Sequence, residues 1–386
     1  MSNVKYKVIY MVNIKEFQEQ LIEYSKEIGI DKIGFTTADP FIQLKERLKL
    51  QQNLNYQSGF ESEDLDARTD AKKIMSEAQS IISIALAYPN KMTGAPQSKK
   101  GETRGIFCRS SWGEDYHRVL KRKLVELEAY ILLHFPNAKV QSMVDTGELV
   151  DRAVAERAGI GWSGKNCSII TPEFGSYVYI GEIITSIPFF PSTPIEDQCG
   201  ECTKCIDICP TGAIVGPGQL NAKHCVSFLT QTKEMIPLEF RERIGNRIYG
   251  CDSCQTICPK NKGLDFHIHD EMEPDPETVK PLLRSLLNVS NREFKTKYGY
   301  LSGSWRGKNP IQRNAIIALA HFKDESAVED LKQLVKKDPR PVIRGTAVWA
   351  ISKIEGEKSK SFLENCLLTE SEDIVIEEIK NAIVNF

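Results

Sequence analysis

The sequence contains no apolar run long enough to cross a lipid bilayer, which takes about 20 consecutive apolar residues. Its first residues also lack the apolar segment and the small-residue cleavage site of a secretory signal. A strong excess of one charge is absent too, since the net charge is only -2 over 386 residues. These absences predict a cytoplasmic protein that does not bind membranes, and they give no whole-chain sign of a polyanionic partner.

Disulfide bonds are a further feature that we expect to be absent. The chain has 11 cysteines, but a reducing cytoplasm disfavours structural disulfides. Eight of the cysteines fall between Cys199 and Cys258, whereas Cys108, Cys167 and Cys366 stand alone. The clustered cysteines are therefore predicted to be metal ligands or redox groups.

The first cysteine run is CGECTKCIDICP, residues 199–210, in which the fourth cysteine is followed by proline. Zinc sites usually combine two C-x2–4-C pairs that are separated by a loop. The C-x2-C-x2-C-x3-C-P run is instead typical of bacterial ferredoxins, where three thiolates bind one [4Fe–4S] cube and the fourth binds a second cube. The second set follows in CDSCQTICP, residues 251–259, and Cys225 completes eight ligands. Two [4Fe–4S] clusters are therefore predicted, with zinc as the alternative.

Each cysteine run is predicted to lend one thiolate to the other run's cube, which would bring the two cubes close enough for fast electron transfer. The first cube takes Cys199, Cys202, Cys205 and Cys258, and the second takes Cys209, Cys225, Cys251 and Cys254. Neither run has the C-x3-C-x2-C order of a radical-SAM site, and every iron has a thiolate. That chemistry is therefore excluded.

Helix and strand patterns predict an α+β multidomain protein with three parts. Residues 1–190 form a mixed α/β domain, residues 191–265 a ferredoxin-like domain with two [4Fe–4S] clusters, and residues 266–386 a helical domain. A proline-rich stretch and a charged, proline-containing stretch mark the two boundaries. In the first domain we expect helices over 16–29, 115–135 and 147–159, and strands over 80–89, 139–146 and 177–185.

The helical domain contains an internal repeat. Residues 309–337 are predicted to form a helical hairpin, and residues 340–354 resemble its first half. Arg313 aligns with Arg344, which gives a period of 31 residues (344 − 313). A period in this range predicts stacked HEAT-like helix pairs, and an ordinary helical bundle is the alternative.

The same domain carries a local excess of positive charge. Residues 281–350 contain 13 Lys and Arg against 6 Asp and Glu, a net charge of +7 (13 − 6), in a chain whose total is −2. Basic helical surfaces bind RNA backbones, and aromatic side chains among them stack on unpaired bases. The alternative is a solvated basic face with Trp305 in the core. The candidate RNA contacts are Lys233, Arg292, Ser304, Trp305, Arg306, Gly307, Lys308 and Arg313.

A ferredoxin needs only about 60 residues of this chain, so the first domain must use the electrons. Its run VDTGELVDRAVAERAGIGWSGKNCSII, residues 144–170, is followed by the double-cluster sequence and then by the helical repeats. Together with DYH at residues 115–117, this order of motifs resembles the epoxyqueuosine reductase family. The resemblance extends from about residue 17 to the C-terminus.

The resemblance implies a cofactor, a reaction and partners. The family is similar in its core to reductive dehalogenases and binds cobalamin beside two [4Fe–4S] clusters. It reduces the epoxide of epoxyqueuosine at the tRNA wobble position to queuosine and water, which is the last step of queuosine biosynthesis. The implied partners are tRNAs with a GUN anticodon (Asp, Asn, His and Tyr) and an external electron donor of the flavodoxin or ferredoxin type, and we expect a monomer.

Asp145 is the predicted proton donor, because opening the epoxide consumes two electrons and two protons. Iron–sulfur cubes deliver single electrons, so a corrin is a suitable two-electron converter. Asp145 lies at the end of a predicted strand, a frequent place for catalytic groups, and burial beside a corrin and a substrate would keep its carboxyl protonated near neutral pH. The alternative is that Asp145 caps the helix predicted over 147–159.

The cobalamin contacts are predicted from the resemblance and from the polar, glycine-containing run GWSGKNCSI, residues 161–169. Cys108 faces the cobalt in this interpretation, or is a small buried hydrophobe. DYHRVL departs from the D-x-H-x-x-G corrinoid motif at Leu120, so His117 is interpreted as a helix-start residue. The predicted cofactor-binding residues are Arg68, Cys108, Asp145, Ser168 and Ile169.

Two other functions fit parts of the sequence. A corrinoid iron–sulfur reductase of a small molecule, similar to a dehalogenase, would also need the first two domains, but the basic helical domain argues against it. A soluble electron carrier with a protein-docking helical domain would hold clusters without a corrin and would not bind tRNA.

Overall fold

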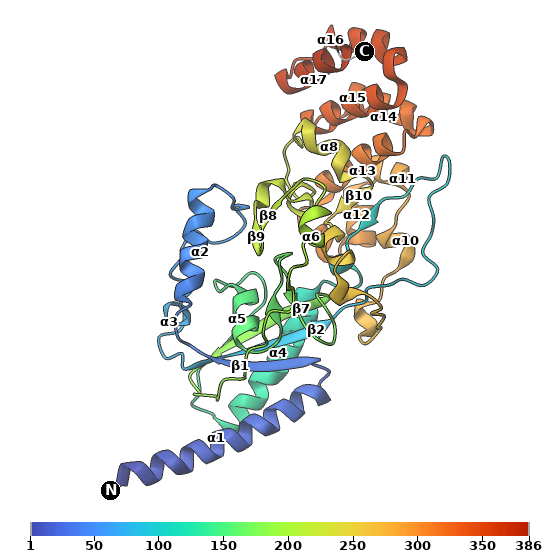
Figure 1. Cartoon of the computed structure of the whole chain (residues 1–386). Helices are drawn as coiled ribbons and strands as arrows, with labels where there is room; N and C mark the ends of the chain where they lie inside the picture. Colours follow the sequence, from blue (N-terminus) through green and yellow to red (C-terminus); the bar gives the residue numbers. More distant parts are fainter. Residues whose placement is uncertain (1, 385–386) are drawn as a thin grey trace.

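The computed structural model describes residues 2–384 and has three parts that follow one another along its length (Figure 1). The α/β part lies at the end where α1 (Ser2–Glu27) projects, the cysteine-rich part lies in the middle, and the helical part lies at the other end. The predicted α+β multidomain fold is therefore confirmed.

The α/β part is built on a four-stranded antiparallel sheet with the order β1-β2-β7-β4. Its central strands β2 (Ser80–Ala87) and β7 (Val178–Thr185) match the predicted strands closely, and β2 is buried at all eight positions. A strand that is buried throughout must be covered on both faces. The edge strands are β1 (Lys32–Thr37) and β4 (Val140–Met143).

Helices cover the two faces of this sheet. The residues Ile82, Ile84 and Leu86 point to one face, where they pack against α4 (Tyr116–His134) and α1. Their neighbours along β2 point to the other face, against α5 (Asp151–Arg157). The alternation follows from the two-residue period of a strand. Two more helices flank the sheet, α2 (Ile42–Asn53) and α3 (Ala71–Ile74).

The sequence prediction is wrong in detail on either side of Asp145. The helix predicted over 147–159 begins only at Asp151, and the strand predicted over 139–146 ends at Met143. The residues between them form bends, in which Asp145 has a left-handed φ of 51°. A non-glycine residue pays conformational energy in that region, so the chain breaks both regular elements to hold Asp145 there.

A long connection after β2 leaves the α/β part and joins it to the rest of the protein. It runs along one side of the molecule toward the helical part (Figure 1). There, β3 (Ile106–Phe107) pairs in parallel with β10 (Arg247–Tyr249), and the Thr103 hydroxyl donates a 2.6 Å hydrogen bond to Asp324. This connection therefore brings a segment of the first predicted domain into contact with the cysteine-rich part and the helical part.

The cysteine-rich part consists of short elements. The helices α6 (Lys204–Asp207) and α9 (Ser253–Thr256) each begin inside a C-x2-C pair. The remaining elements are β8 (Ile214–Gly216), β9 (Gln219–Leu220), α7 (Val226–Leu229) and α8 (Leu238–Ile244). A hairpin of β5 (Trp162–Ser163) and β6 (Ile169–Ile170), from the α/β part, carries the run GWSGKNCSI.

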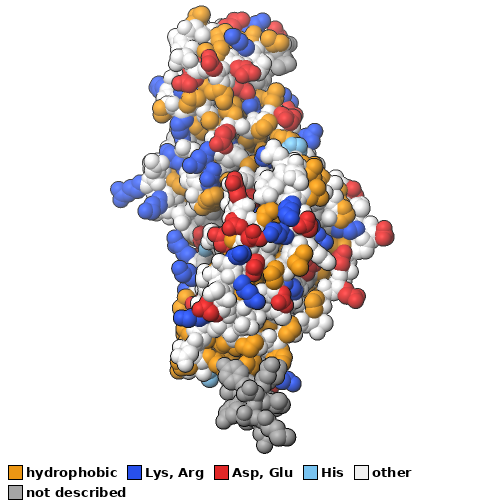
Figure 2. All heavy atoms as spheres, turned by 90° about the vertical axis from the view of Figure 1, so that its left-hand side faces the viewer, with side chains coloured by type: hydrophobic (Ala, Val, Ile, Leu, Met, Phe, Trp, Pro, Cys, Tyr) orange, Lys and Arg blue, Asp and Glu red, His pale blue; other side chains and the backbone are white. Residues whose placement is uncertain are grey.

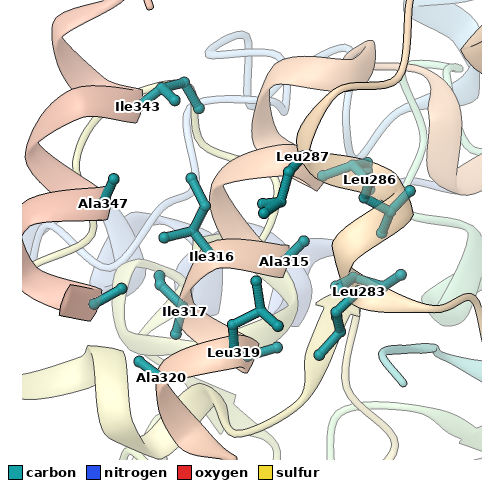
Figure 3. Packing of buried hydrophobic residues seen from close by; sticks show 14 of the residues in the cluster. Leu283, Leu286, Leu287, Ala315, Ile316, Ile317, Leu319, Ala320, Ile343 and Ala347 are labelled. Carbon is teal, nitrogen blue, oxygen red and sulfur yellow. The ribbon is translucent and has the colours of Figure 1, made fainter. Parts of the chain in front are cut away.

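The helical part stacks successive helices around one apolar core. In Figure 3, Leu287 of α11 points toward Ala315 and Ile316 of α13, and Ile343 and Ala347 of α15 lie on the other side of α13. The predicted helical repeat is confirmed. Its helices are α10 (Pro276–Val279), α11 (Leu283–Leu287), α12 (Asn291–Tyr298), α13 (Lys308–His321), α14 (Val328–Lys337), α15 (Pro341–Glu355), α16 (Lys360–Leu367) and α17 (Asp373–Val384).

The repeated arginine of this domain has a structural role. Arg313 is only 1% exposed, and its guanidinium donates hydrogen bonds to the carbonyl oxygens of Leu229 and Thr232. Arg344, one repeat later, forms a bidentate pair with Glu370. The prediction that Arg313 contacts RNA is therefore wrong, because its donors are committed inside the protein. Both arginines that repeat with the 31-residue period therefore join neighbouring segments of the protein by hydrogen bonds.

A buried ion pair fastens the last helix to the cysteine-rich part. Arg241 of α8 donates two hydrogen bonds, of 2.8 and 2.7 Å, to the carboxylate of Glu378 in α17. The side chains are 4% and 13% exposed. Loss of one partner leaves an uncompensated buried charge, which is far more costly than loss of an exposed pair.

We expect Glu378→Ala to lower the free energy of unfolding by about 3–5 kcal/mol, because it strands the Arg241 guanidinium. The matched control is Glu242→Ala, which removes an exposed pair between Lys353 and the same helix α8 and should cost less than about 1 kcal/mol. Equilibrium unfolding in urea measures both. Equal losses in the two variants would contradict the role of the buried pair.

Candidate active site

Asp145 lies in the loop of residues 144–150, which we call the acid loop, at the end of edge strand β4. The hydroxyl of Tyr116 donates a 2.8 Å hydrogen bond to its Oδ2, and Nε2 of His117 lies 3.4 Å from the same oxygen. Its backbone N–H donates to Oδ2 of Asp151 at 3.0 Å. The helix-capping alternative is wrong, because α5 begins at Asp151 with Val150 as its N-cap and no side-chain cap.

The charges around Asp145 favour a carboxylate paired with an imidazolium. Burial opposes the charged form of His117, but hydrogen bonds to Asp115 and Asp145 outweigh it and raise the pKa of His117 to about 9. The hydrogen bond from His117, supported by Tyr116, lowers the pKa of Asp145 below its ordinary value. At neutral pH the proton therefore resides on His117. The Asp145 side chain is 61% exposed and accepts a hydrogen bond from Tyr116, and both features favour its charged form. Its protonation beside a corrin and a substrate stays a prediction.

The first turn of α4 positions these partners. Asp115 is the N-cap and accepts a hydrogen bond from the His117 backbone, while its carboxylate also lies 2.7 Å from Nδ1 of His117. The ring of Tyr116 stacks on Tyr179 of β7 at 4.5 Å. The sequence reasoning missed Tyr116 and set His117 aside. The signal was the DYH run, an N-cap followed by two proton-carrying side chains.

Two further carboxyls lie behind the acid loop. Burial and the charge of Asp145 raise the pKa of Asp151 to about 6. Glu182, which is fully buried in β7, has a pKa that burial and Asp151 raise well above its ordinary value. Glu182 therefore holds its proton at neutral pH. The acid loop is thus backed by a protonated side chain, on the face opposite to His117.

Cys108 packs against the second cysteine run. Its side chain is 7% exposed, and burial raises the pKa of its thiol far above the ordinary value. A Cβ atom on Gly250, which has a left-handed φ of 69°, would lie only 2.2 Å from Sγ of Cys108. Glycine is thus needed at this position. A cavity of about 380 Å³ opens between Cys108 and Cys251, so the predicted cofactor contact lies directly beside a predicted cluster ligand.

The eight clustered cysteines lie near enough to one another to affect one another's pKa, mainly within two groups. Burial raises the pKa of the Cys258 thiol, and negative charge on Cys199 and Cys202 raises it further. Burial also raises the pKa of Cys205, with a smaller contribution from Cys258 and Cys199. The pKa of Cys225 is raised by burial and by charge on Cys251 and Cys209. The pKa of Cys254 is raised by burial and then chiefly by charge on Cys251, Cys225 and Cys209. Most of these effects connect cysteines of the same predicted ligand set, and the assignment of each cysteine to a cluster stays a prediction.

Backbone N–H groups prepare one crossing ligand for metal binding. The N–H of Ala213 points to Sγ of Cys209 at 3.2 Å. Burial opposes the thiolate form, but this and neighbouring backbone hydrogen bonds lower the pKa of Cys209. A stabilised thiolate is the ligand form that an iron–sulfur cluster needs, and N–H donors to sulfur tune the cluster's potential.

The β5–β6 hairpin offers buried donors for a large polar cofactor. Nε1 of Trp162 and Nδ2 of Asn166 are buried without a hydrogen-bond partner. The backbone N–H of Ser168 donates to Oδ1 of Asn166, and Ile169 is 4% exposed. Buried unpaired donors are costly, so they indicate a ligand with acceptor atoms. The amide oxygens and phosphate of cobalamin fit this requirement.

Arg68 lies on the other side of the acid loop. Burial lowers the pKa of its guanidinium, whereas the nearby carboxylates Glu61 and Glu148 oppose that shift. Glu148 belongs to the acid loop, so Arg68 and Asp145 border one region. Cys108 and Asp145 both lie near Tyr249. The joint role of Arg68, Cys108, Asp145, Ser168 and Ile169 in one cofactor site stays a prediction.

The predicted RNA contacts divide into exposed and committed side chains. Trp305 is 53% exposed, so the alternative that places it in the core is wrong. Lys233 and Arg292 are also exposed. Ser304, Arg306, Gly307 and Lys308 are half-buried, and Nζ of Lys308 donates to the carbonyl of Val289 at 3.0 Å. On the side of the molecule that carries α2, Lys and Arg side chains gather along one edge (Figure 2).

Three protein families match successive parts of the chain. Residues 68–146 match "Epoxyqueuosine reductase QueG, DUF1730", residues 198–261 match the "4Fe-4S double cluster binding domain", and residues 308–383 match "HEAT repeats". The second match contains all eight clustered cysteines and selects iron–sulfur clusters over the zinc alternative.

Similar proteins match nearly the whole chain. The epoxyqueuosine reductase of Bacillus anthracis is 63% identical over 96% of this chain and 98% of its own length, and that of Bacillus subtilis is 62% identical over 96% of both. The structure of an epoxyqueuosine reductase with an epoxyqueuosine-modified tRNA-Tyr stem loop matches with a TM-score of 0.94 and 62% identity, covering 96% of this chain and 99% of that one. A Bacillus subtilis structure with its catalytic aspartate loop swung out of the active site has a TM-score of 0.94 and 61% identity, with the same coverages. The chain belongs to the epoxyqueuosine reductase family.

Proposed function

We propose that this chain removes the epoxide oxygen of epoxyqueuosine at the wobble position of tRNA and forms queuosine, as an oxidoreductase. The observation that carries the proposal is the His117–Asp145 pair, a proton source. Tyr249 lies near both Asp145 and Cys108, and Cys108 lies beside the loop with Cys251. The reaction needs two protons and two electrons. The His117–Asp145 pair would supply protons, and the predicted clusters near Cys108 would supply electrons. A similar protein has been solved with an epoxyqueuosine-modified tRNA stem loop, which supports tRNA as the substrate.

The cofactors are two [4Fe–4S] clusters and cobalamin. We assign Cys199, Cys202, Cys205 and Cys258 to one cluster, and Cys209, Cys225, Cys251 and Cys254 to the other. Arg68, Cys108, Asp145, Ser168 and Ile169 would border the cobalamin, with Trp162 and Asn166 supplying buried donors. Bound cobalamin supplies the two-electron nucleophile that single-electron clusters cannot provide.

Asp145 and His117 move the proton. The Asp145 carboxylate accepts a proton from the His117 imidazolium as substrate binding removes water from the acid loop, because desolvation raises the pKa of the carboxyl. Asp145 then protonates the departing epoxide oxygen. Asp115 holds the imidazole by Nδ1 so that Nε2 faces Asp145. This order keeps the predicted role of Asp145 and adds His117 as the store of its proton.

The finer assignments about partners are part of the proposal. The substrates are tRNAs with a GUN anticodon (Asp, Asn, His and Tyr), the electron donor is a flavodoxin or ferredoxin, and the chain acts as a monomer in the cytoplasm. Within the described residues 2–384, no helix is long and apolar enough to span a membrane. The division into domains at about residues 190 and 265 belongs to the same proposal.

One assay separates this function from its rivals. The protein is purified without oxygen, supplied with cobalamin, a strong reductant and tRNA that carries epoxyqueuosine, and the digested RNA is analysed for queuosine. We expect queuosine only with both cobalamin and reductant. Cobalamin-dependent turnover of a small halogenated substrate without queuosine would favour the dehalogenase-like rival, and clusters without a bound corrin or tRNA would favour the electron carrier.

Replacement of the proton donor should stop the reaction and leave the redox groups intact. We expect Asp145→Asn to lower the single-turnover rate by about 100-fold or more, the usual range for general acid–base catalysis, because the amide cannot deliver the proton. The cluster absorbance should not change. Glu148→Gln, in the same loop, is the matched control and should retain most activity. Wild-type activity of Asp145→Asn would overturn the assignment.

The single-turnover rate should depend on the protonation of His117. The pKa of His117 is raised to about 9, so the imidazolium is fully present at neutral pH and is lost as the pH rises through about 9. The rate should therefore be level from pH 7 to 8 and fall above pH 9. In His117→Gln this decline should vanish together with about 100-fold of the rate. A level rate to pH 10 in the unmodified protein would contradict the role of His117.

A further inference from the structure

A buried carboxyl group without a cation lies beneath the acid loop. Glu182 of β7 is 0% exposed, and neither of its side-chain oxygens receives a hydrogen bond from a donor within residues 2–384. Its neighbours across the sheet are Met143 of β4 and Ser83 of β2, both uncharged. An ionised carboxyl group without a partner is too costly to bury, so Glu182 carries its proton.

Asp151 is the polar group that faces Glu182. It is the first residue of α5, which packs on this face of the sheet in a cluster that contains Val154 and Ile184. Ile184 lies two residues after Glu182 and therefore points to the same side of β7. The two carboxyl groups lie within hydrogen-bond reach of each other. Two carboxyl groups form such a bond only when one of them carries a proton, so the proton of Glu182 lies between them.

Asp151 in turn holds the backbone of the acid loop. Its Oδ2 accepts the backbone N–H of Asp145 at 3.0 Å. Asp145 has a φ of 51°, a strained conformation that lasts only while neighbouring contacts enforce it. The partners of the Asp145 carboxylate, Tyr116 and His117, belong to α4, which covers the other face of the sheet. Asp151 therefore restrains Asp145 from the α5 side and keeps its carboxylate within reach of His117.

We infer that protonated Glu182 is a positioning residue for the reaction: its carboxyl group donates a hydrogen bond to Asp151 and thereby fixes the loop that carries Asp145. This inference rests on the proposed function, in which Asp145 delivers the proton, and it adds a residue that no step of that function uses. Glu182 keeps its own proton throughout. Without that proton, two buried carboxylates would repel each other, and Asp151 would turn toward solvent and release the Asp145 N–H.

The surroundings of Glu182 keep this hydrogen bond in place over a wide pH range. Burial raises the pKa of Glu182 well above its ordinary value, and the nearby Asp151 and Asp145 add to that shift. The neighbouring strands contribute only the uncharged side chains of Ser83 and Met143. A change of side chain, and not a change of pH, is therefore the way to break the bond.

Two replacements separate the hydrogen bond from the burial of the side chain. Glu182→Gln keeps a donor, because its amide N–H can replace the carboxyl O–H, and should retain most of the single-turnover rate. Glu182→Leu keeps a similar volume without a donor. We expect it to lose about 100-fold of the rate, the cost of misplacing a catalytic group by about 1 Å. The matched control is Ser83→Ala, which removes the unpaired hydroxyl beside Glu182 and should keep the rate.

Urea unfolding separates positioning from folding. Replacing a buried carboxyl pair by apolar groups is often neutral or stabilising, so Glu182→Leu should unfold at the same urea concentration as the unmodified protein or at a higher one. Asp151→Ala breaks the same link from its other end and should show the same loss of rate. It keeps the test usable if Glu182→Leu does not fold.

The pKa of His117 reports the position of Asp145 without turnover. Although burial opposes the shift, hydrogen bonds to Asp115 and Asp145 raise the pKa of His117 to about 9. NMR of cluster-loaded protein with labelled histidines follows all six histidines, and His117→Gln identifies the signal. In Glu182→Leu the Asp145 carboxylate moves away, so the pKa of His117 should fall by about one unit or more. Glu182→Gln and Ser83→Ala should leave it at about 9.

The two readouts keep this inference apart from the proposed function. An unchanged pKa of His117 in Glu182→Leu would overturn the inference whether or not the rate falls, because Asp145 would not have moved. An equal fall in Ser83→Ala or in Glu182→Gln would also overturn it. If the unmodified protein forms no queuosine while the pKa of His117 falls only in Glu182→Leu and Asp151→Ala, the proposed function fails and the positioning link stands.

Discussion

The parallel pairing of β3 with β10 is the contact on which the site depends. It carries a segment of the α/β part across to the cysteine-rich part, where the N–H of Cys108 donates to the carbonyl of Tyr249 at 2.9 Å. Gly250 follows, and its missing side chain lets the loop with Cys251 approach Cys108. A two-electron reduction fed by single-electron clusters requires such closeness, because the electrons and the proton must reach one substrate. The pairing therefore fixes Cys108 beside Cys251, a predicted cluster ligand.

The proton supply is arranged around a carboxylate that is ionised at neutral pH. His117 and Tyr116 hold the Asp145 carboxylate from one side, and the Asp151 carboxylate holds its backbone from the other. Asp145 keeps a strained φ of 51° only while these contacts last. A loop held by a few polar contacts at a sheet edge is suited to move when substrate arrives, and a Bacillus subtilis relative has been solved with its catalytic aspartate loop swung out.

The sequence predicted the separate parts of this protein better than the contacts between those parts. The spacing of the cysteines and the 31-residue repeat are local patterns, so the cluster-binding part and the helical repeats could be predicted directly. The sheet is antiparallel throughout, and Asp145 follows its edge strand β4, which the sequence pattern alone does not identify as an edge. The pairing of β3 with β10 joins residues more than 130 positions apart, and no periodicity encodes it. Arg313 was misassigned because a buried arginine that binds carbonyl oxygens has the same sequence signature as one that binds phosphate.

The central claim is that electrons from two clusters and a proton from Asp145 are consumed together in one turnover. The most direct measurement is a single turnover of the fully reduced, cobalamin-loaded protein with epoxyqueuosine-modified tRNA, with the clusters followed by absorbance and the RNA by nucleoside analysis. The account predicts that the protein loses two electrons for each queuosine formed. Queuosine formed without electron loss, or electron loss without queuosine, would contradict it.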